Sequence, residues 1–374
     1  MKKLMLGVVA LSFLATGAHA SKARLQALGQ DADGSLFVDD HRNIFFNPAT
    51  INYHRDLITL EAGAASSSDS AATPSSEGGF IKSRGNMVYG LHFGNQNETI
   101  KAVRTAGKAT VFDNVEGNIL DFFVGGDAGV LWGVDLSYGT YMDEQATNEI
   151  EASFMRSKVG VIKGNVEAFL DFSLQDTAEE KDNAEVAIKS AYDLMVAYNL
   201  RSDAKAYIRY MAINAEEKEI DAKDEDYKAG MMAIGYGRVR SLNNKANLNY
   251  NIAYVTTSKE NETFTKAKET KSMSVPLVIG LEYKAKDWLT VRGSVSQKIL
   301  SEEESLSGTK VKKKTSANST AVNAGVSLHF GDLQIDGLVG NNTGGAAAST
   351  DTSRGNGTLR TDNLMSRVSA TYKF

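Results

Sequence analysis

Apolar and polar residues alternate strictly along many stretches of the chain. In the stretch 246–254 the apolar set is Ala246, Leu248, Tyr250, Ile252 and Tyr254, and mostly asparagines stand between them. A period of two places alternate side chains on opposite faces of a strand, and a helix cannot use it. The same pattern recurs at 132–138, 166–174, 192–200, 277–283 and 322–330. The chain is therefore predicted to be all-β, with strands that have one apolar and one polar face.

The predicted strands are long for a water-soluble protein. Most runs cover nine to twelve residues, whereas strands of soluble proteins average about five or six. A tilted strand that crosses a membrane needs about nine to eleven residues. Aromatic residues such as Tyr138, Tyr198 and Trp288 stand near strand ends, where interfacial girdles lie in membrane barrels. Length and aromatic placement both favour a membrane-spanning antiparallel barrel of up-and-down topology.

The connections between these runs alternate between short and long. Short ones fall at 125–129, 163–165, 201–204, 238–245, 284–287 and 331–332, and long ones near 142–149, 176–188, 214–227, 258–271, 301–318 and 341–361. Membrane barrels have tight turns at one end and longer loops at the other. From Val130 onward the chain holds twelve predicted strands, and earlier runs raise the number to fourteen. The alternative is sixteen, if 83–86 is a turn that splits the run 80–94.

The chain ends on an amphipathic strand, Asn363–Phe374, in which Val368, Ala370, Tyr372 and Phe374 share the apolar face. An ending of this kind resembles the outer-membrane β-barrels. The resemblance implies that Phe374 and Tyr372 are read by the barrel-assembly machinery, and that the barrel, residues 56–374, lies among outer-membrane lipids and lipopolysaccharide of a Gram-negative cell. If the short turns are periplasmic, the C-terminus is periplasmic as well.

Residues 1–20 have the features of a secretory signal peptide. Lys2 and Lys3 precede an apolar run of about a dozen residues, and Ala18-His19-Ala20 is an A-x-A cleavage site. The net charge is −5, and −7 without the two lysines, which argues against nucleic acid as a partner. With no cysteine in the chain, disulfides and thiolate metal sites are excluded. Three prolines against 33 glycines suit strands and turns.

The segment 21–55 has poor periodicity, with a helix expected around 23–29 and irregular backbone after it. It contains Leu28-Gly29, Val38-Asp39-Asp40 and Asn47-Pro48-Ala49, and a strand follows at Leu57. This order resembles the N-terminal segment of the FadL-type long-chain fatty-acid transporters. In that family the segment folds into the barrel as a plug, and the Asn-Pro-Ala motif sits at its junction with the wall. The resemblance implies a plug at 21–55, with Asn47, Pro48 and Ala49 as its motif.

The polar strand faces are predicted to line the barrel interior, because a charge facing lipid at mid-bilayer costs about 2–4 kcal/mol for Arg or Lys. The interior is then of mixed charge, which suits a water-filled pore; alternatively, opposite charges pair across strands and brace the wall. The lumen-lining candidates are Asp135, Arg156, Lys158, Glu167, Asp171, Asp193, Arg209, Glu282, Arg292, Lys298 and Asp336, joined near the C-terminus by Arg367 and Lys373.

The sequence offers no recognisable catalytic or metal-binding motif. The histidines after residue 20 are His41, His54, His92 and His329, and none has another ligand type at metal-site spacing. His329 lies two residues from Ser327 on a polar face, but a lipase-like site would need an orienting carboxylate or amide as well. No enzymatic activity, metal or cofactor is expected.

Three functions remain open from the sequence. The mixed-charge interior favours a porin-like pore for passive diffusion of small solutes. The plug and the Asn-Pro-Ala motif favour FadL-like passage of hydrophobic molecules past the plug. The long charged loops suggest a structural or surface-display barrel without an open pore.

Overall fold

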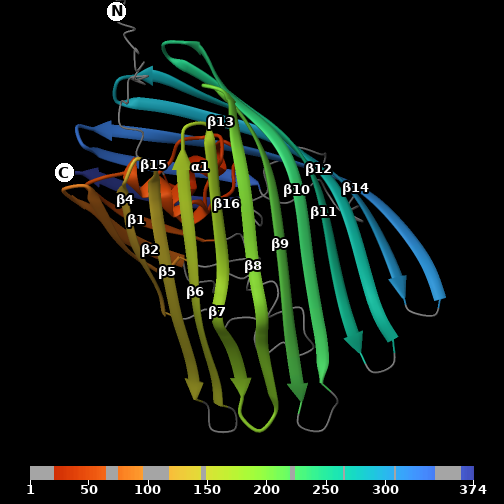
Figure 1. The fold of residues 1–374 in the computed structure, drawn as a ribbon. Helices are drawn as coiled ribbons and strands as arrows, with labels where there is room; N and C mark the ends of the chain where they lie inside the picture. Colours follow the sequence, from red (N-terminus) through yellow and green to blue (C-terminus); the bar gives the residue numbers. More distant parts are fainter. Residues whose placement is uncertain are drawn as a thin grey trace, which may run out of the picture.

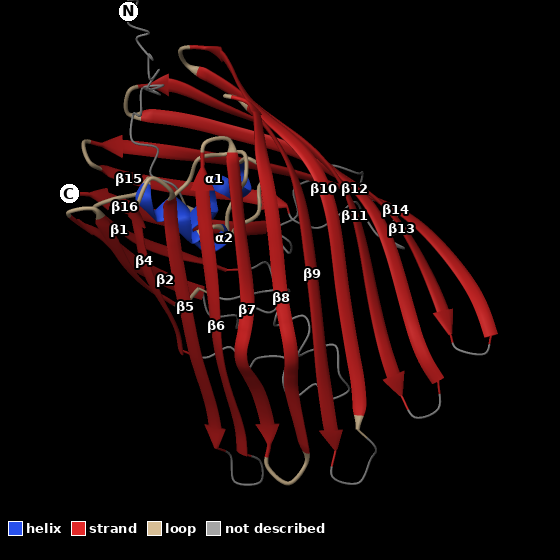
Figure 2. Cartoon of the chain, in the orientation of Figure 1, coloured by secondary structure: helices blue, strands red, loops and turns tan. Residues whose placement is uncertain are grey.

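The computed structural model describes residues 21–64, 75–95, 118–144, 149–219, 224–263, 266–306, 309–341 and 364–374. Within these residues the alternating runs form sixteen antiparallel strands, each paired with its neighbours in sequence, in one closed barrel (Figures 1 and 2). The expected signal peptide, 1–20, lies outside the described residues. The strands are β1 (Leu57–Ala64), β2 (Ser75–Arg84), β3 (Met87–Phe93), β4 (Asn118–Asp127), β5 (Leu131–Glu144), β6 (Glu149–Lys163), β7 (Val166–Glu180), β8 (Ala184–Arg201), β9 (Ala204–Glu219), β10 (Glu225–Asn243), β11 (Ala246–Thr263), β12 (Lys266–Lys286), β13 (Leu289–Leu306), β14 (Thr309–Phe330), β15 (Leu333–Asn341) and β16 (Leu364–Lys373).

The barrel closes where the last strand meets the first. β16 pairs antiparallel with β1 from Leu57↔Lys373 to Ala64↔Ser366. The backbone N–H of Phe374 donates to the carbonyl of Asp56 at 3.0 Å, and the Lys82 ammonium lies 4.6 Å from the centre of the Phe374 ring. Closure leaves no strand edge exposed to lipid, which a membrane-spanning sheet requires.

The strand count of sixteen follows from a tight turn at 84–87. Arg84 pairs with Met87, and Gly85 takes the left-handed φ of +61° that such a turn needs. The run 80–94 is therefore split between β2 and β3, as in the alternative count, and the favoured count of fourteen gives way to sixteen.

Several stretches expected to be long loops are the ends of long strands. β7 and β8 are joined by only three residues near 181–183, and β14 alone has 22 residues. At about 3.3 Å per residue β14 spans roughly 70 Å, far more than the apolar band of about 25 Å in such barrels. Beyond such a band outward side chains need not be apolar, so the apolar alternation that marks a strand in the sequence is lost while the backbone ladder continues.

The outside of the barrel carries a belt of exposed apolar side chains. On β8 the outward residues Leu194 and Val196 are 44% and 47% exposed, while the inward Asp193 and Met195 are buried. Soluble proteins rarely expose contiguous apolar patches larger than a few hundred Å², so this belt is the lipid-facing surface. It continues around the wall in residues such as Ile58, Leu60, Leu136, Tyr138, Val161, Leu170, Ile208, Ile234, Ile252, Ile279, Val295, Val326 and Val368.

Register shifts change which residues of β7 and β8 face inward. The β7–β8 pairing runs from Val166 to Phe172 and resumes only at Thr177, while the β8–β9 register shifts between Ile188 and Ser190. Bulges of this kind reverse the alternation. On β8 the buried inward positions therefore pass from odd numbers, such as Asp193, to even numbers, such as Ile188 and Val186.

The segment before β1 is folded inside the barrel. It contains α1 (Lys22–Ala27), α2 (Asn43–Phe46) and the 3-10 helix η1 (Pro48–Asn52), which lie at the end of the barrel where the C-terminus lies (Figures 1 and 2). An apolar cluster joins it to β1–β4: Ile44, Phe45, Ile51, Leu57, Ile81, Val88 and Phe123. No helix in the described part of the chain is long and apolar enough to cross a membrane.

Candidate functional site

The inner segment 21–55, here called the plug, lies across the short-turn end of the barrel. Several of its contacts with the wall lie toward the short turns: Ile51 meets Gly125, Pro48 meets Gly133, Phe37 meets Gly237 and Ala27 meets Gly325. These partners stand on β4, β5, β10 and β14, so the plug contacts widely separated parts of the wall.

The Asn-Pro-Ala motif docks on two glycines of the wall. The side chain of Asn47 caps η1 by accepting a hydrogen bond from the N–H of Ala49 at 3.1 Å, and Pro48 occupies the first turn, where its missing N–H costs nothing. A Cβ placed on Gly133 would lie 2.2 Å from the Pro48 carbonyl, and one on Gly160 would lie 1.9 Å from Asn47 Oδ1. Only glycine lets the motif approach the wall this closely.

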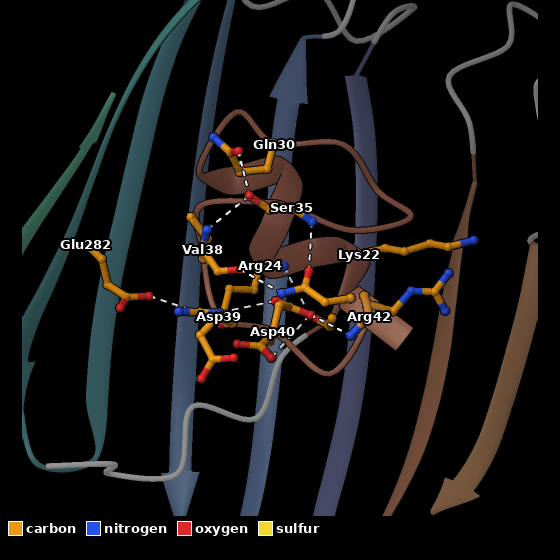
Figure 3. A network of polar contacts seen from close by, with 12 residues as sticks. Lys22, Arg24, Gln30, Ser35, Val38, Asp39, Asp40, Arg42 and Glu282 are labelled. Atoms are coloured by element: carbon orange, nitrogen blue, oxygen red, sulfur yellow. Dashed lines mark hydrogen bonds and ion pairs between the residues drawn. The ribbon is translucent and has the colours of Figure 1, made fainter. Parts of the chain in front are cut away.

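Charges on the plug pair with charges on the wall. Figure 3 shows the centre of this network, where Arg24 donates to Glu282 of β12 at 3.1 Å, to the Asp39 carbonyl at 2.7 Å and to Asp40 at 3.2 Å. Arg292 of β13 joins Glu282 to Asp336, which also accepts from the hydroxyl of Ser21. The predicted interior residues Glu282, Arg292 and Asp336 therefore hold the plug.

A second ionic group joins the plug to β1 and β2. Lys22 and Arg42 reach Glu77 of β2 at 2.7 Å and 3.1 Å, and the backbone N–H of Lys22 donates to Glu61 of β1 at 3.0 Å. The guanidinium of Arg42 is fully buried and also lies 4.1 Å from the Phe45 ring centre. Sequence reasoning missed Glu61 and Glu77, although Glu61 follows Thr59 on the polar face of a run that alternates with Ile58 and Leu60.

Burial alters the acid–base behaviour of the plug. It raises the pKa of Asp40 to about 8, although the Arg24 guanidinium opposes this rise. It also lowers the pKa of His54, against the pull of the Asp39 carboxylate. The docked plug therefore holds a proton on Asp40 at pH values where a solvent-exposed aspartate has lost it.

A cavity of about 340 Å³ lies on the long-hairpin side of the plug. Its floor is the plug, with Phe37, Phe45 and Phe46, and its walls are the inner faces of β4–β9 and Asn251 of β11. Aromatic contacts order this floor, since Phe46 packs edge-on against Phe169 with centroids 4.9 Å apart. Phe154, Tyr207, Ile119 and Met211 add further apolar surface.

The basic residues predicted to line the interior beside this cavity are paired with neighbouring acids. Arg209 donates to Asp193 through Nε at 2.9 Å, Arg156 lies 3.1 Å from Asp171, and Lys158 lies 3.4 Å from the same carboxylate. Nearer the short turns Lys205 lies 2.6 Å from Glu167.

The remaining candidates lie apart from the cavity lining. Lys298 is exposed farther along β13, Arg367 is half-buried on β16, and Lys373 is exposed at the short-turn end. Ser327 bonds to Asp336, while His329 Nε2 contacts Thr290 Oγ1 at 3.1 Å, so these two side chains have separate partners. No group of three metal-binding side chains occurs among the described residues.

Above the cavity the inner wall carries two apolar clusters, with the buried carboxylates Asp176, Glu180, Glu217 and Glu225 on the same group of strands. Ala191 and Ile213 line the cavity itself and belong to a buried cluster on β8–β10 with Ile188, Ala215 and Tyr227. A neighbouring cluster on β6–β8 contains Ala152, Ala178, Ala184 and Val186. Six of these residues were missed because they fall in stretches expected to be loops, 176–188 and 214–227: Ala178, Ala184, Val186, Ile188, Ala215 and Tyr227.

Among solved structures, the chain is similar to several outer-membrane proteins. The toluene transporter TodX of Pseudomonas putida aligns over 95% of this chain and 98% of its own, with 11% identity and a TM-score of 0.40. A Pseudomonas aeruginosa FadL homologue aligns over the same shares, with 11% identity and a TM-score of 0.43. The alcaligin receptor FauA of Bordetella pertussis aligns over 85% of this chain and 76% of its own, with 9% identity and a TM-score of 0.45.

Searches by sequence gave no relatives: no family description and no curated protein matches the chain. A FadL homologue is thus among its structural neighbours.

Proposed function

We propose that the protein is an outer-membrane transporter for small apolar or amphipathic molecules. Such molecules enter at the long-hairpin end, follow the apolar inner wall of β6–β10, bind in the cavity and leave past the plug. The observation that carries this proposal is the pair of apolar clusters on the inner wall, next to a cavity that has aromatic side chains and the docked plug as its floor. The cavity also carries polar and charged side chains, and concave sites that combine apolar surface with convergent polar groups are typical of small-molecule binding.

The interior charges support this route better than a porin-like pore. A porin needs charged side chains that face water along an open lumen, whereas Arg209, Arg156, Lys205, Arg24 and Arg292 each lie in an ion pair with a neighbouring acid. The plug also docks on both flanks of the wall through buried ionic groups. Passive diffusion of small polar solutes through a water-filled lumen is therefore the second candidate.

The proposed orientation places the short turns, the plug and Phe374 in the periplasm. The long hairpins then extend outward from the cell, where their charged faces meet water and lipopolysaccharide. A signal peptide at 1–20 and recognition of Tyr372 and Phe374 by the assembly machinery belong to the same proposal.

Uptake by intact cells tests the proposal. Gram-negative cells that produce the protein should take up a labelled apolar aromatic compound faster than cells without it, because lipopolysaccharide slows entry of apolar compounds. Uptake of a labelled disaccharide serves as the porin control and should not change. Faster disaccharide entry together with unchanged aromatic entry would favour the pore instead.

A further inference from the structure

Two carboxylates at the bottom of the cavity are incompletely hydrogen-bonded. Asp121 of β4 and Asp135 of β5 both line the cavity, with only 2% and 4% of their surface exposed. The hydroxyl of Ser137 donates to Asp121 Oδ1 at 2.6 Å and lies 3.4 Å from Asp135 Oδ2. Asp121 Oδ2 and Asp135 Oδ1 are buried without a hydrogen-bond donor among the described residues.

The nearby cations are directed elsewhere. Lys158 is the register neighbour of Asp135, but its ammonium donates to the carbonyl of Phe45 in the plug and pairs with Asp171. Arg156 pairs with the same Asp171. A buried carboxylate oxygen without a donor is costly, so these two oxygens favour a ligand that brings hydrogen-bond donors.

The charge of the whole lining points to a cationic ligand. The cavity is lined by six aspartates and three basic residues, which leaves an excess of negative charge among the described residues. The aspartates are Asp31, Asp33, Asp121, Asp135, Asp171 and Asp193. The rings of Phe154 and Phe169 line the same cavity, and aromatic rings attract cations as well as apolar groups.

We infer that the cavity is a binding site for an amine-bearing amphiphile, an arylalkylamine in its protonated form. Its ammonium lies between Asp121 and Asp135, where it supplies the donors that both carboxylates lack. Its ring lies against Phe154 and Phe169. This inference rests on the proposed transport function and narrows it to one class of substrate.

A bare metal ion fits the site less well. Calcium takes six to eight oxygen ligands and magnesium needs a near-octahedral set. Among the described residues, the hydrogen bonds around the two carboxylates add one oxygen, the hydroxyl of Ser137. An ammonium needs only two or three acceptors and tolerates aromatic neighbours.

Calorimetric titration of the purified full-length barrel in detergent tests the site, with empty micelles as the blank. The probes are 2-phenylethylamine, the neutral 2-phenylethanol and the acidic 3-phenylpropanoate. The amine should bind roughly tenfold or more tightly than the alcohol, and the acid more weakly than both. Equal affinity for amine and alcohol would overturn the inference.

Asp135→Asn and Asp121→Asn assign the preference to these carboxylates. Each keeps the shape of the side chain and removes its charge, so the ratio of amine to alcohol affinity should fall to about one. Asp287→Asn, at a fully exposed carboxylate in a short turn, is the matched control and should keep the ratio. An unchanged ratio of amine to alcohol affinity in both Asn variants would show that the amine binds elsewhere and would overturn the assignment. Two variants are tested so that misfolding of one of them does not prevent the comparison.

Uptake of the same probes separates this inference from the proposed function. If the amine binds more tightly in titration but neither probe enters cells that produce the protein any faster, the transport proposal is wrong and the binding site stands. If both probes enter faster but titration shows no preference for the amine, the binding site is wrong and the transport proposal stands.

Discussion

At the scale of single residues, glycines on the inner wall determine whether the plug can dock. Gly133 and Gly160 have no Cβ where the Asn-Pro-Ala motif touches the sheet, and the backbone of Pro48 and the side chain of Asn47 occupy that space. The motif can be recognised in the sequence, but the wall glycines that it contacts cannot. A glycine in a strand indicates that another group approaches the backbone closely but does not identify that group.

Gly160→Ala should therefore weaken docking of the plug. The added Cβ would overlap Asn47 Oδ1, and overpacking of this kind costs about 1–3 kcal/mol. The fraction of molecules with a released plug can be measured by electron-spin resonance, as the distance between two spin labels. One label is attached at Asp39→Cys, an exposed position in the plug, and the other at Ala128→Cys in a short turn. Gly293→Ala is the control, since its nearest atom would lie 3.6 Å away. Equal plug release in the two variants would contradict the docking geometry.

Docking should also depend on pH through Asp40. In the docked plug the pKa of Asp40 is about 8, because of burial, whereas a released aspartate titrates near 4. Between these values the docked form holds a proton that the released form has lost, so docking weakens as the pH rises and levels off above about 8.

His54 acts in the opposite direction but at lower pH. Burial lowers its pKa, so its contribution changes only below its ordinary value of about 6.5. The interval from about pH 6.5 to 8 therefore excludes the titration of His54 and includes that of Asp40. The labelled chain should show more released plug at pH 8 than at 6.5, and Asp40→Asn should reduce the difference; a flat curve in the unsubstituted labelled chain would count against a buried, protonated Asp40.

At the scale of elements, the sequence predicted strands best where one face of a strand meets lipid and the other face meets the barrel interior. In 246–254 and 322–330 apolar residues alternate with polar ones for this reason, and both stretches are strands. Near 176–188 bulges shift the parity, and along 301–318 the sequence has no apolar alternation, so the same rule predicted loops where strands continue. The ion pairs of Arg24 and Arg209 could not be predicted because they require the registers of strands and plug.

The plug is the element that must move if solutes leave at the short-turn end. Because the chain has no cysteine, Ala27→Cys with Gly325→Cys would give a single disulfide between α1 and β14. The two Cβ positions would start 2.6 Å apart, and separation by about 1 Å reaches the usual disulfide distance of about 3.5–4.5 Å.

Oxidation of this pair should lower uptake of the apolar aromatic compound to the level of cells without the protein, and reduction should restore it. Each single cysteine variant serves as the control. Unchanged uptake by the oxidised pair would show that solutes do not need the plug to move away from β14.

At the scale of the whole molecule, a lipid-facing belt surrounds an interior that is closed by its own N-terminal segment. The belt makes the barrel a membrane protein, and the ionic groups around Arg24 and Arg42 hold the plug at the short-turn end. Above it, the apolar walls of β6–β10 lead to the cavity. The same sixteen strands would form an ion-conducting pore if the plug left its place.

Single-channel recording in planar bilayers tests this account most directly. The full-length protein should give no large, steady conductance steps, because the docked plug crosses the lumen, and Gly160→Ala should give brief openings that Gly293→Ala does not. Large and steady steps from the unsubstituted protein would contradict the account and establish an open pore.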